Sequence, residues 1–467
     1  MVDARRGAAQ SLPRPLTTTR GTYAADMSET TAPEQEVVRI CRDLLRIDTS
    51  NYGPGQEGPG EREAADYVVD QLREVGLEPQ VFESEPGRTT VAVRIAGADR
   101  DRGALCIHGH LDVVPAHAED WSVPPFDGVE RDGCLWGRGA VDMKDMVAMM
   151  LACVRHLART STVPPRDLLF VFFADEEAGG VLGSQFMVRE HREVFDGVTE
   201  AISEVGGYSV TVDDAKGEPR RAYLLQTAEK GIAWLRLEAK GTAGHGSVPT
   251  SDNPIVHLAE AIARIDAHTW PREFIASVRG LLDGLSELTG VGYSDEDAEA
   301  LLERIGPAAG FVRGALQDTA NVTMLDAGYK HNVVPQTASA SLDCRFLPGH
   351  EEDLMATIHE LAGEHVEVVV DHRDISLDAP FDGELVDRMR AALLGEDPEA
   401  TILPYCLSGG TDNKALEALG VVGYGFAPLR LPADLPFAPM FHGIDERVPL
   451  ESLEFGARVL WRLVEDC

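Results

Sequence analysis

The chain has 467 residues, a length typical of two or three domains. Its 78 acidic and 42 basic residues give a formal net charge of −36, and only six of the basic residues are Lys. Because affinity for nucleic acid and for anionic membranes depends on clustered Lys and Arg, this composition argues against both kinds of partner.

The N-terminal segment and the cysteines bear on location. Residues 1–26 contain Arg, Ser and Thr but no apolar segment of the kind that a secretory signal needs. We expect a disordered leader there, or an upstream start codon with Met27 as the real start. The seven cysteines are odd in number, widely spread and free of any CxxC pair. They argue against a disulfide framework and a cysteine zinc site, and they predict a reducing, cytoplasmic location.

Helical and extended patterns alternate through the first half of the chain. Residues 34–47 and 61–76 have apolar stripes typical of amphipathic helices, and a third helix is expected over 145–159. The strands expected here are 91–95, 104–108, 167–173 and 201–204. The middle strands are apolar throughout, as in a sheet covered on both faces. The pattern predicts an α/β fold with a mostly parallel sheet.

Near residue 228 the pattern changes. Residues 231–241 alternate like a strand with one solvated face, and if this strand lies at a sheet edge it could pair with a second copy. The elements expected after it are a helix over 254–265, a long acidic helix-rich stretch over 267–318, strands over 321–329 and 337–347, a helix over 350–365 and a strand over 366–373. The order predicts a small α+β domain, residues 229–380, inserted between catalytic parts 27–228 and 381–467.

Histidines and carboxylates follow several of the predicted strands. These residues are His110, Asp112, Asp175, Glu176, Glu177 and Glu204, with Asp142 in a Gly-flanked loop and His442 near the C-terminus. Because the carboxyl ends of parallel strands meet at one edge, we expect these side chains to gather there. Each alone has an ordinary structural explanation, but clustered carboxylates repel unless cations neutralise them. Two His and three carboxylates around two divalent ions would solve that problem, with zinc favoured and cobalt or manganese possible.

Five motifs occur in the order HGHLDVVPA, GRGAVDMKD, ADEE, SEVGG and FHGIDE. This set resembles the dinuclear zinc peptidases and deacylases that include acetylornithine deacetylase, succinyl-diaminopimelate desuccinylase, glutamate carboxypeptidase and carboxypeptidase S. The resemblance extends over about residues 34–465. It implies a zinc-hydrolase catalytic domain of α/β type and an inserted α+β domain that acts as lid and dimer interface.

The resemblance also implies a ligand set for two divalent metal ions per chain. Asp142 would bridge both ions. Glu177 and His442 would complete the coordination of one ion, and His110 and Glu204 would complete the coordination of the other.

Two further roles are implied beside the metals. Asp112 would hold the free N–H of the His110 imidazole. Glu176 would be the general base that takes a proton from the attacking water and passes it to the leaving nitrogen.

Residues of the inserted domain and of a glycine pair are implied to handle the substrate. His245 would reach the partner's active site and help stabilise the oxyanion, although it could also be an ordinary turn histidine. Asn332 and Arg345 would bind the substrate, and the Arg345 guanidinium would bind the substrate's carboxylate. Arg345 could instead only form a salt bridge at a strand edge. Gly409 and Gly410 would let the backbone approach the ligand.

We therefore expect a dinuclear metallohydrolase that cleaves an amide bond of a small peptide or an N-acyl amino acid. We also expect a homodimer formed through the lid domain, with no nucleic-acid or membrane partner. The sequence does not separate a peptidase from an N-deacylase. A catalytically inactive, metal-stabilised binding protein is the other open class, and Glu176 argues against it because binding alone gives no reason for a base beside the ligands.

Overall fold

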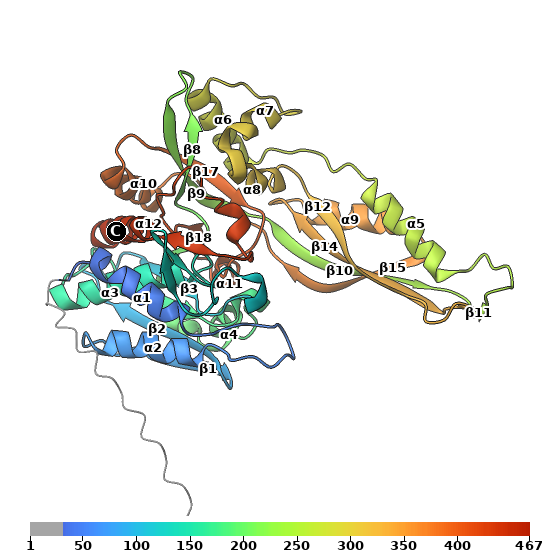
Figure 1. Ribbon diagram of the computed structural model, residues 1–467, viewed down its shortest axis with the longest axis horizontal. Helices are drawn as coiled ribbons and strands as arrows, with labels where there is room; N and C mark the ends of the chain where they lie inside the picture. Colours follow the sequence, from blue (N-terminus) through green and yellow to red (C-terminus); the bar gives the residue numbers. More distant parts are fainter. Residues whose placement is uncertain (1–30) are drawn as a thin grey trace, which may run out of the picture.

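The computed structural model of the protein describes residues 31–467, with the side chains of residues 307, 308 and 311 left aside. The predicted leader, residues 1–26, lies outside the described residues. Within the described range the strands form a ten-stranded sheet, a four-stranded sheet and two small sheets of three and two strands. Figure 1 shows that the four-stranded sheet extends as an arm from the body that contains the large sheet.

The large sheet is parallel at its centre and antiparallel at its margins. Strands β6, β3, β7 and β18 run parallel to one another, and β17 runs parallel to β9. The strands in spatial order are β1 (Gln80–Glu85), β2 (Arg88–Ile95), β6 (Leu168–Phe173), β3 (Ala104–His110), β7 (Val198–Ser203), β18 (Val422–Gly425), β9 (Pro219–Glu229) and β16 (Leu377–Asp378), while β8 (Tyr208–Asp213) and β17 (Thr401–Leu407) also pair with β9. The predicted parallel core of the α/β fold is thus present.

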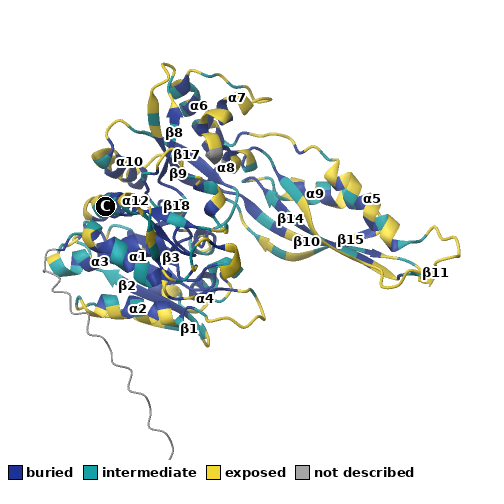
Figure 2. Ribbon diagram, in the orientation of Figure 1, coloured by how far each residue is buried: buried dark blue, intermediate teal, exposed yellow. Residues whose placement is uncertain are grey.

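Helices cover both faces of the large sheet, which explains why its central strands are apolar throughout. Every residue of β3 and of β6 is buried, and Figure 2 shows the central strands in the colour of buried residues. One face packs against α1 (Pro33–Leu45), α2 (Arg62–Arg73), α3 (Lys144–Thr160) and α12 (Leu450–Asp466), and α10 (Glu384–Glu396) packs on α12. The other face packs against α4 (Ser184–Glu190), η3 (Arg192–Phe195) and α11 (Asn413–Glu417).

The four-stranded sheet has the order β12 (Thr319–Ala327), β14 (Thr337–Phe346), β10 (Gly231–Lys240) and β15 (Val366–Asp374). The alternating burial of β10 agrees with the predicted half-solvated strand, and its apolar face packs against α5 (Pro254–Asp266) and α9 (Glu351–Ala362). However, β10 pairs on both sides along its length and is not an edge strand. The edges are β12 and β15, so the predicted pairing of residues 231–241 with a second copy is wrong.

The acidic stretch over 267–318 packs away from the four-stranded sheet. It forms α6 (Ala276–Thr289), α7 (Glu299–Leu302), η4 (Glu303–Ala308) and α8 (Ala309–Gly314). Apolar residues of these helices belong to the core of the large sheet, where α6 and α8 contact β17 and η4 contacts β8. The domain boundaries at 228/229 and 380/381 stay predictions, but this part of the predicted insert is packed with the main body.

None of the helices in residues 31–467 combines the length and apolar character that crossing a membrane requires.

Gly231 lies at the point where the chain passes from the large sheet to the four-stranded sheet. A Cβ atom on Gly231 would lie 2.0 Å from Cε2 of the buried Phe346 ring. Gly231→Ala should therefore lower the free energy of unfolding by about 1–3 kcal/mol through overpacking. A Cβ on Gly244 would meet no atom within 4 Å, so Gly244→Ala is a matched control with an expected change under about 0.5 kcal/mol. Urea unfolding that finds equal stability for both variants would contradict the steric role of Gly231.

Candidate dinuclear metal centre

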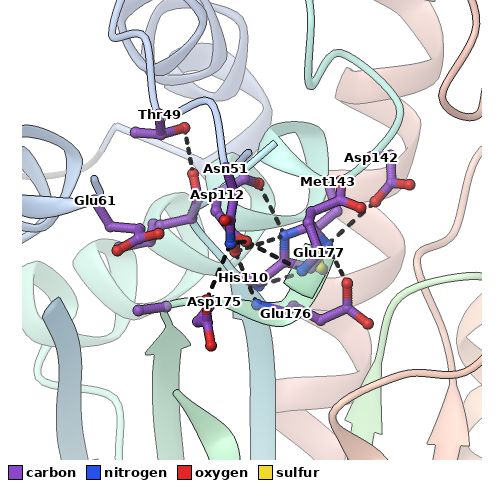
Figure 3. A network of polar contacts seen from close by, with 12 residues as sticks. Thr49, Asn51, Glu61, His110, Asp112, Asp142, Met143, Asp175, Glu176 and Glu177 are labelled. Carbon is purple, nitrogen blue, oxygen red and sulfur yellow. Dashed lines mark hydrogen bonds and ion pairs between the residues drawn. The ribbon is translucent and has the colours of Figure 1, made fainter. Parts of the chain in front are cut away.

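The predicted histidines and carboxylates gather at the carboxyl edge of the large sheet. Figure 3 shows His110, Asp112, Asp142, Glu176 and Glu177 of this set. His110 is the last residue of β3, and Glu204 directly follows β7. Glu176 and Glu177 open the short helix η2 (Glu176–Ala178) just after β6. Two loops complete the set, one with Asp142 before α3 and one with His442 after η5 (Ala438–Met440). The three-stranded sheet of β4 (Val129–Arg131), β5 (Cys134–Trp136) and β19 (Arg447–Pro449) joins these two loops.

The Asp142 carboxylate lies between two imidazole rings. Its Oδ1 is 3.1 Å from Nε2 of His110, and its Oδ2 is 3.3 Å from Nε2 of His442. Nε2 of His442 is also 3.0 Å from Oε2 of Glu177. On the other side, Nε2 of His110 is 3.5 Å from Oε2 of Glu204. These distances divide the five residues into two groups that share Asp142.

Glu176 stands beside the group that contains His110. Its Oε2 is 3.9 Å from Nε2 of His110. The Glu176 side chain also lines the cavity described below, together with Glu177 and Asp142. A carboxylate in this position can reach both the metal ligands and a substrate in the cavity, which is the geometry that a general base needs.

Asp112 holds the η2 turn rather than the imidazole alone. Nδ1 of His110 is 3.0 Å from the main-chain oxygen of Asp112 and 3.5 Å from its carboxylate oxygen Oδ1. The same carboxylate accepts hydrogen bonds from the main-chain N–H groups of Glu176 and Glu177, at 3.1 Å each. The predicted contact with His110 is therefore shared with the main chain, and the Asp112 carboxylate fixes the position of Glu176 and Glu177.

Sequence reasoning did not find the residues that hold Asp112. Nδ2 of Asn51 donates to Oδ2 of Asp112 at 2.9 Å and to Oδ1 of Asp175 at 3.1 Å. Arg88 donates to Oδ1 of Asn51 at 2.9 Å and also pairs with the buried Glu61. Asn51 and Glu61 bracket the Gly- and Pro-rich loop after α1, and nothing in a loop of that composition distinguishes a buried amide from an exposed one.

Glu446 supports the Asp142 loop from the segment that carries His442. Its carboxylate is fully buried and accepts hydrogen bonds from the main-chain N–H groups of Val141 and Asp142, at 2.6 and 2.9 Å, and from Gly139. It also forms an ion pair of 2.7 Å with Arg138. The FHGIDE motif contains Glu446, so its presence in a motif was the only sequence signal for this role.

The carboxylates at this edge are buried close together, and this raises the pKa values of Glu204 and Glu176. Burial raises the pKa of Glu204 to about 8, and repulsion from Asp142 and Glu177 adds to the effect. Burial and the charge of Glu204 raise the pKa of Glu176 well above its usual value. Hydrogen bonds to Asp142 and Glu177 raise the pKa of His442 to about 10. Cations at this edge would therefore relieve strong carboxylate repulsion.

The donor set fits divalent metal ions. Candidate ligand atoms of His110, Asp142 and Glu177 lie within 4.8 Å of one another, and so do those of His110, Glu176 and Glu204. Imidazole nitrogens and carboxylate oxygens without thiolate suit zinc, cobalt and manganese. The residues present can therefore hold divalent metal ions.

A cavity of about 820 Å³ opens beside these residues, and both the large sheet and the four-stranded sheet contribute to its wall. The apolar side chains in its wall include Val181, Val188, Ile232, Trp234, Leu407 and Phe441. Three residues predicted to bind substrate, Arg345, Gly409 and Gly410, also line it. The volume suits a small molecule with an apolar part.

His245 and Asn332 lie elsewhere. His245 is in β11 (Gly244–His245), which pairs with β13 (Val333–Val334) at the far tip of the arm (Figure 1). Both residues are exposed, and Nδ1 of His245 is 2.8 Å from Oγ of Ser247. Within one chain the structure does not bring these two residues to the metal ligands.

A model of the peptidase family M20/M25/M40 matches residues 106–466. The chain belongs to this family. Two curated relatives are similar over most of their length. The N-fatty-acyl-amino acid synthase/hydrolase PM20D1 of Xenopus tropicalis is 26% identical over 446 residues, covering 92% of this chain and 86% of the relative. Aminoacylase-1 of Sus scrofa is 28% identical over 425 residues, covering 89% of this chain and 91% of the relative.

The fold likeness extends to solved structures. An M20 family metallo-carboxypeptidase, Sso-CP2 from Sulfolobus solfataricus, superposes with a TM-score of 0.69 at 18% identity, covering 92% of this chain and 98% of that one. The predicted family, fold class and enzyme class are confirmed, and the protein is an M20 metallohydrolase that acts on amide bonds. The assignment of single residues as metal ligands, base or substrate contacts stays a prediction.

Glu446→Gln tests the support of the Asp142 loop in this M20 chain. Glutamine keeps the size but turns an N–H₂ group toward main-chain N–H donors or Arg138. We expect metal affinity and kcat/KM to fall about tenfold to a hundredfold, the usual effect of removing a group that orients a ligand. Metal content after dialysis against buffered zinc, together with turnover, measures the change.

Glu451→Gln, at an exposed position early in α12, is the matched control and should leave both quantities unchanged. Parent-like metal affinity in Glu446→Gln would contradict the role given to Glu446.

Proposed function

We propose that the protein uses two divalent metal ions to hydrolyse the amide bond of an N-acyl amino acid or a small peptide. The observation that carries this is the Asp142 carboxylate shared between His110 and His442, beside a cavity lined by Glu176. The names of the relatives, an N-fatty-acyl-amino acid synthase/hydrolase and an aminoacylase, support an acyl group on nitrogen. A peptidase remains the alternative, because both reactions break the same bond.

The proposed ligands are Asp142 for both ions, Glu177 and His442 for one, and His110 and Glu204 for the other. We propose zinc, with cobalt or manganese as alternatives, because the donors are nitrogen and oxygen. The bound ions would polarise the scissile carbonyl and lower the pKa of water.

The chain's own residues would supply the proton transfers and the positioning. Glu176 would take the proton of the attacking water on a carboxylate oxygen and deliver it to the leaving nitrogen as the C–N bond breaks. Asp112 would keep Glu176 in reach through its hydrogen bond to the main chain of that residue. The apolar wall around Trp234 and Leu407 would receive the acyl group or an apolar side chain and exclude water.

Turnover by zinc-loaded protein on N-acyl amino acids and dipeptides tests the function, with Glu176→Gln as the matched variant. Glutamine keeps the shape of the side chain but cannot accept a proton, so turnover should fall by about 10²–10⁴-fold. Elemental analysis should still find two metal ions per chain in Glu176→Gln, and chelation should abolish the parent's activity.

An inactive binding protein would bind metal but cleave nothing in the panel, and that result would overturn the proposal. Near-parent turnover by Glu176→Gln would rule Glu176 out as the base.

We further propose a homodimer in a reducing, cytoplasmic setting without a nucleic-acid partner. All seven cysteines are free thiols in the structure, which fits a reducing compartment. The edge strand β12 is a candidate for the dimer contact, since Met324 is 69% exposed and Leu325 is 65% exposed on it. An apolar edge strand of this kind is normally covered. The tip of the arm could then carry His245 and Asn332 to the active site of the second copy.

Met324→Asp combined with Leu325→Asp should convert the dimer to a monomer in light scattering, because charge would enter the apolar contact. Val163→Asp, at another exposed apolar position, is the control and should remain dimeric.

Co-expression of His245→Ala with Glu176→Gln tests whether His245 acts in the active site of the second copy. Each variant alone should be nearly inactive, but the mixed dimer has one site with both groups and should regain activity. A monomeric parent with full activity would refute the dimer and the role of His245 in trans.

A further inference from the structure

A second cavity, of about 350 Å³, lies at the margin of the large sheet. Within residues 31–467, no residue lines both this margin cavity and the cavity beside the predicted metal ligands. Its wall includes Thr227 of β9, Ser277 near the start of α6, and Asp378 of β16. Pro404 of β17 and residues 379–381 also contribute. The volume lies in the range of small-molecule sites.

Two buried hydroxyl groups in this wall lack a hydrogen-bond partner. Thr227 is 1% exposed and Ser277 is 4% exposed, and neither side-chain oxygen has a partner among the described residues 31–467. Most buried hydroxyl groups in proteins are hydrogen-bonded, because an unpartnered one loses its bonds to water without replacement. Two such groups in the wall of one cavity indicate that the cavity holds a molecule that binds them.

A β-bulge explains why the Thr227 hydroxyl is available. The pairing of β9 with β17 passes from Gln226 and Tyr405 directly to Ala228 and Cys406, so Thr227 is the extra residue between them. A bulge re-aims the side chain that it carries and is common at binding sites. The main chain of Thr227 is still paired, since its oxygen accepts from the N–H of Ala379 at 2.7 Å.

Asp378 adds a carboxylate to the same wall. It pairs with Ala228 through the sheet, next to the bulge, and it is an exposed residue. Its side chain forms no hydrogen bond or ion pair with any of the residues that the structure describes, 31–467. Partial burial of the carboxyl raises its pKa above the usual value. A charged acceptor without a partner therefore stands beside the two hydroxyl groups.

The charges of the wall favour a cationic ligand over an anionic one. Among the described residues that line the margin cavity, Asp378 is the only charged one. The first residues of α6 lie in the wall as well, and a helix N-terminus carries about half a positive charge spread over its first turn. The full charge of the carboxylate exceeds this. An anion would be repelled by Asp378, whereas a cation would compensate it.

The acceptors match a primary ammonium group, and the rest of the wall matches an apolar body. A primary ammonium has three N–H donors, which one carboxylate and two hydroxyl oxygens can accept. The Phe381 ring and the rings of Pro380 and Pro404 supply apolar surface. Arg390 lies over the Phe381 ring, 4.0 Å from its centre, and its charge is paired with Asp387 at 3.1 Å. This contact holds the ring in place.

We propose that the margin cavity binds a small organic molecule with a primary ammonium group and an apolar body. The ammonium would donate to the Asp378 carboxylate and to the hydroxyl oxygens of Thr227 and Ser277, and the apolar body would lie against Phe381. Because no basic side chain lines the wall among the described residues, amines without a carboxylate should bind better than amino acids. The site is separate from amide hydrolysis, and the inference does not depend on the proposed function.

Calorimetry on the full-length protein tests this with two compounds. The first is 2-phenylethylammonium, and the second is its N,N,N-trimethyl derivative, which keeps the charge and the ring but has no N–H donor. The primary ammonium should bind about tenfold to a hundredfold more tightly, the usual range for hydrogen bonds that involve a charged group. Equal affinity would mean that charge and ring alone are recognised, and it would overturn the proposal.

Three variants place the amine in the margin cavity. Asp378→Asn keeps the size but removes the charge, and it should weaken binding of 2-phenylethylammonium about tenfold to a hundredfold. Thr227→Val and Ser277→Ala should each weaken it about threefold to tenfold. Because both hydroxyl groups lack partners in the chain, neither of these two variants should lower the midpoint of urea unfolding. A lower midpoint in both would show that the hydroxyl groups have partners, and it would contradict the proposal.

Asp382→Asn, at an exposed position outside the wall, is the matched control and should leave the affinity unchanged. Binding that Asp378→Asn leaves unchanged would place the amine elsewhere, such as at the predicted metal ligands, and would overturn the proposal. The absence of detectable binding to the parent protein would overturn it as well.

Discussion

The carboxylate of Asp142 joins two imidazoles that come from distant parts of the chain, and the arrangement of the catalytic edge depends on it. Oδ1 faces His110 at the end of a central strand, and Oδ2 faces His442, 300 residues beyond Asp142 in the sequence. Both contacts of Asp142 require that its loop is held in place. The buried Glu446 does this by accepting the N–H groups of Asp142 and its neighbours.

A second buried carboxylate, that of Asp112, holds the main chain on the other side of the site. The η2 turn presents Glu176 and Glu177 because the Asp112 carboxylate binds both of their N–H groups, and Asn51 in turn holds Asp112. Two buried acids, Glu446 and Asp112, thus orient the predicted metal ligands and the predicted base without lining the cavity themselves. Their acceptor capacity is used by the main chain, so they add rigidity without adding further ligands.

The second constraint is the junction between the two sheets. Lys230 lies between β9 and β10, and its ammonium donates to the main-chain oxygens of Gly314 and Gln317 at the end of the acidic helical stretch. Its own carbonyl accepts from Lys414. Because β10 carries Trp234 and Ile232 into the cavity wall, the junction that connects the two sheets also adjoins the cavity. The cavity wall and the connection between the sheets therefore share residues.

The amino-acid sequence determined the features that depend on local pattern and on the carboxyl edge of a parallel sheet. The apolar runs of β3 and β6 predicted buried strands, and the polar residues directly after them predicted where His110 and Glu177 would gather. Only the tertiary structure decided what depends on pairing between distant segments. It placed β10 in the centre of its sheet, packed α6 on the large sheet and paired Arg345 with Asp343. It also buried Lys414 beside Gly410. Strand order and ion pairing are set by contacts between residues far apart in the chain, and no local period or spacing encodes those contacts.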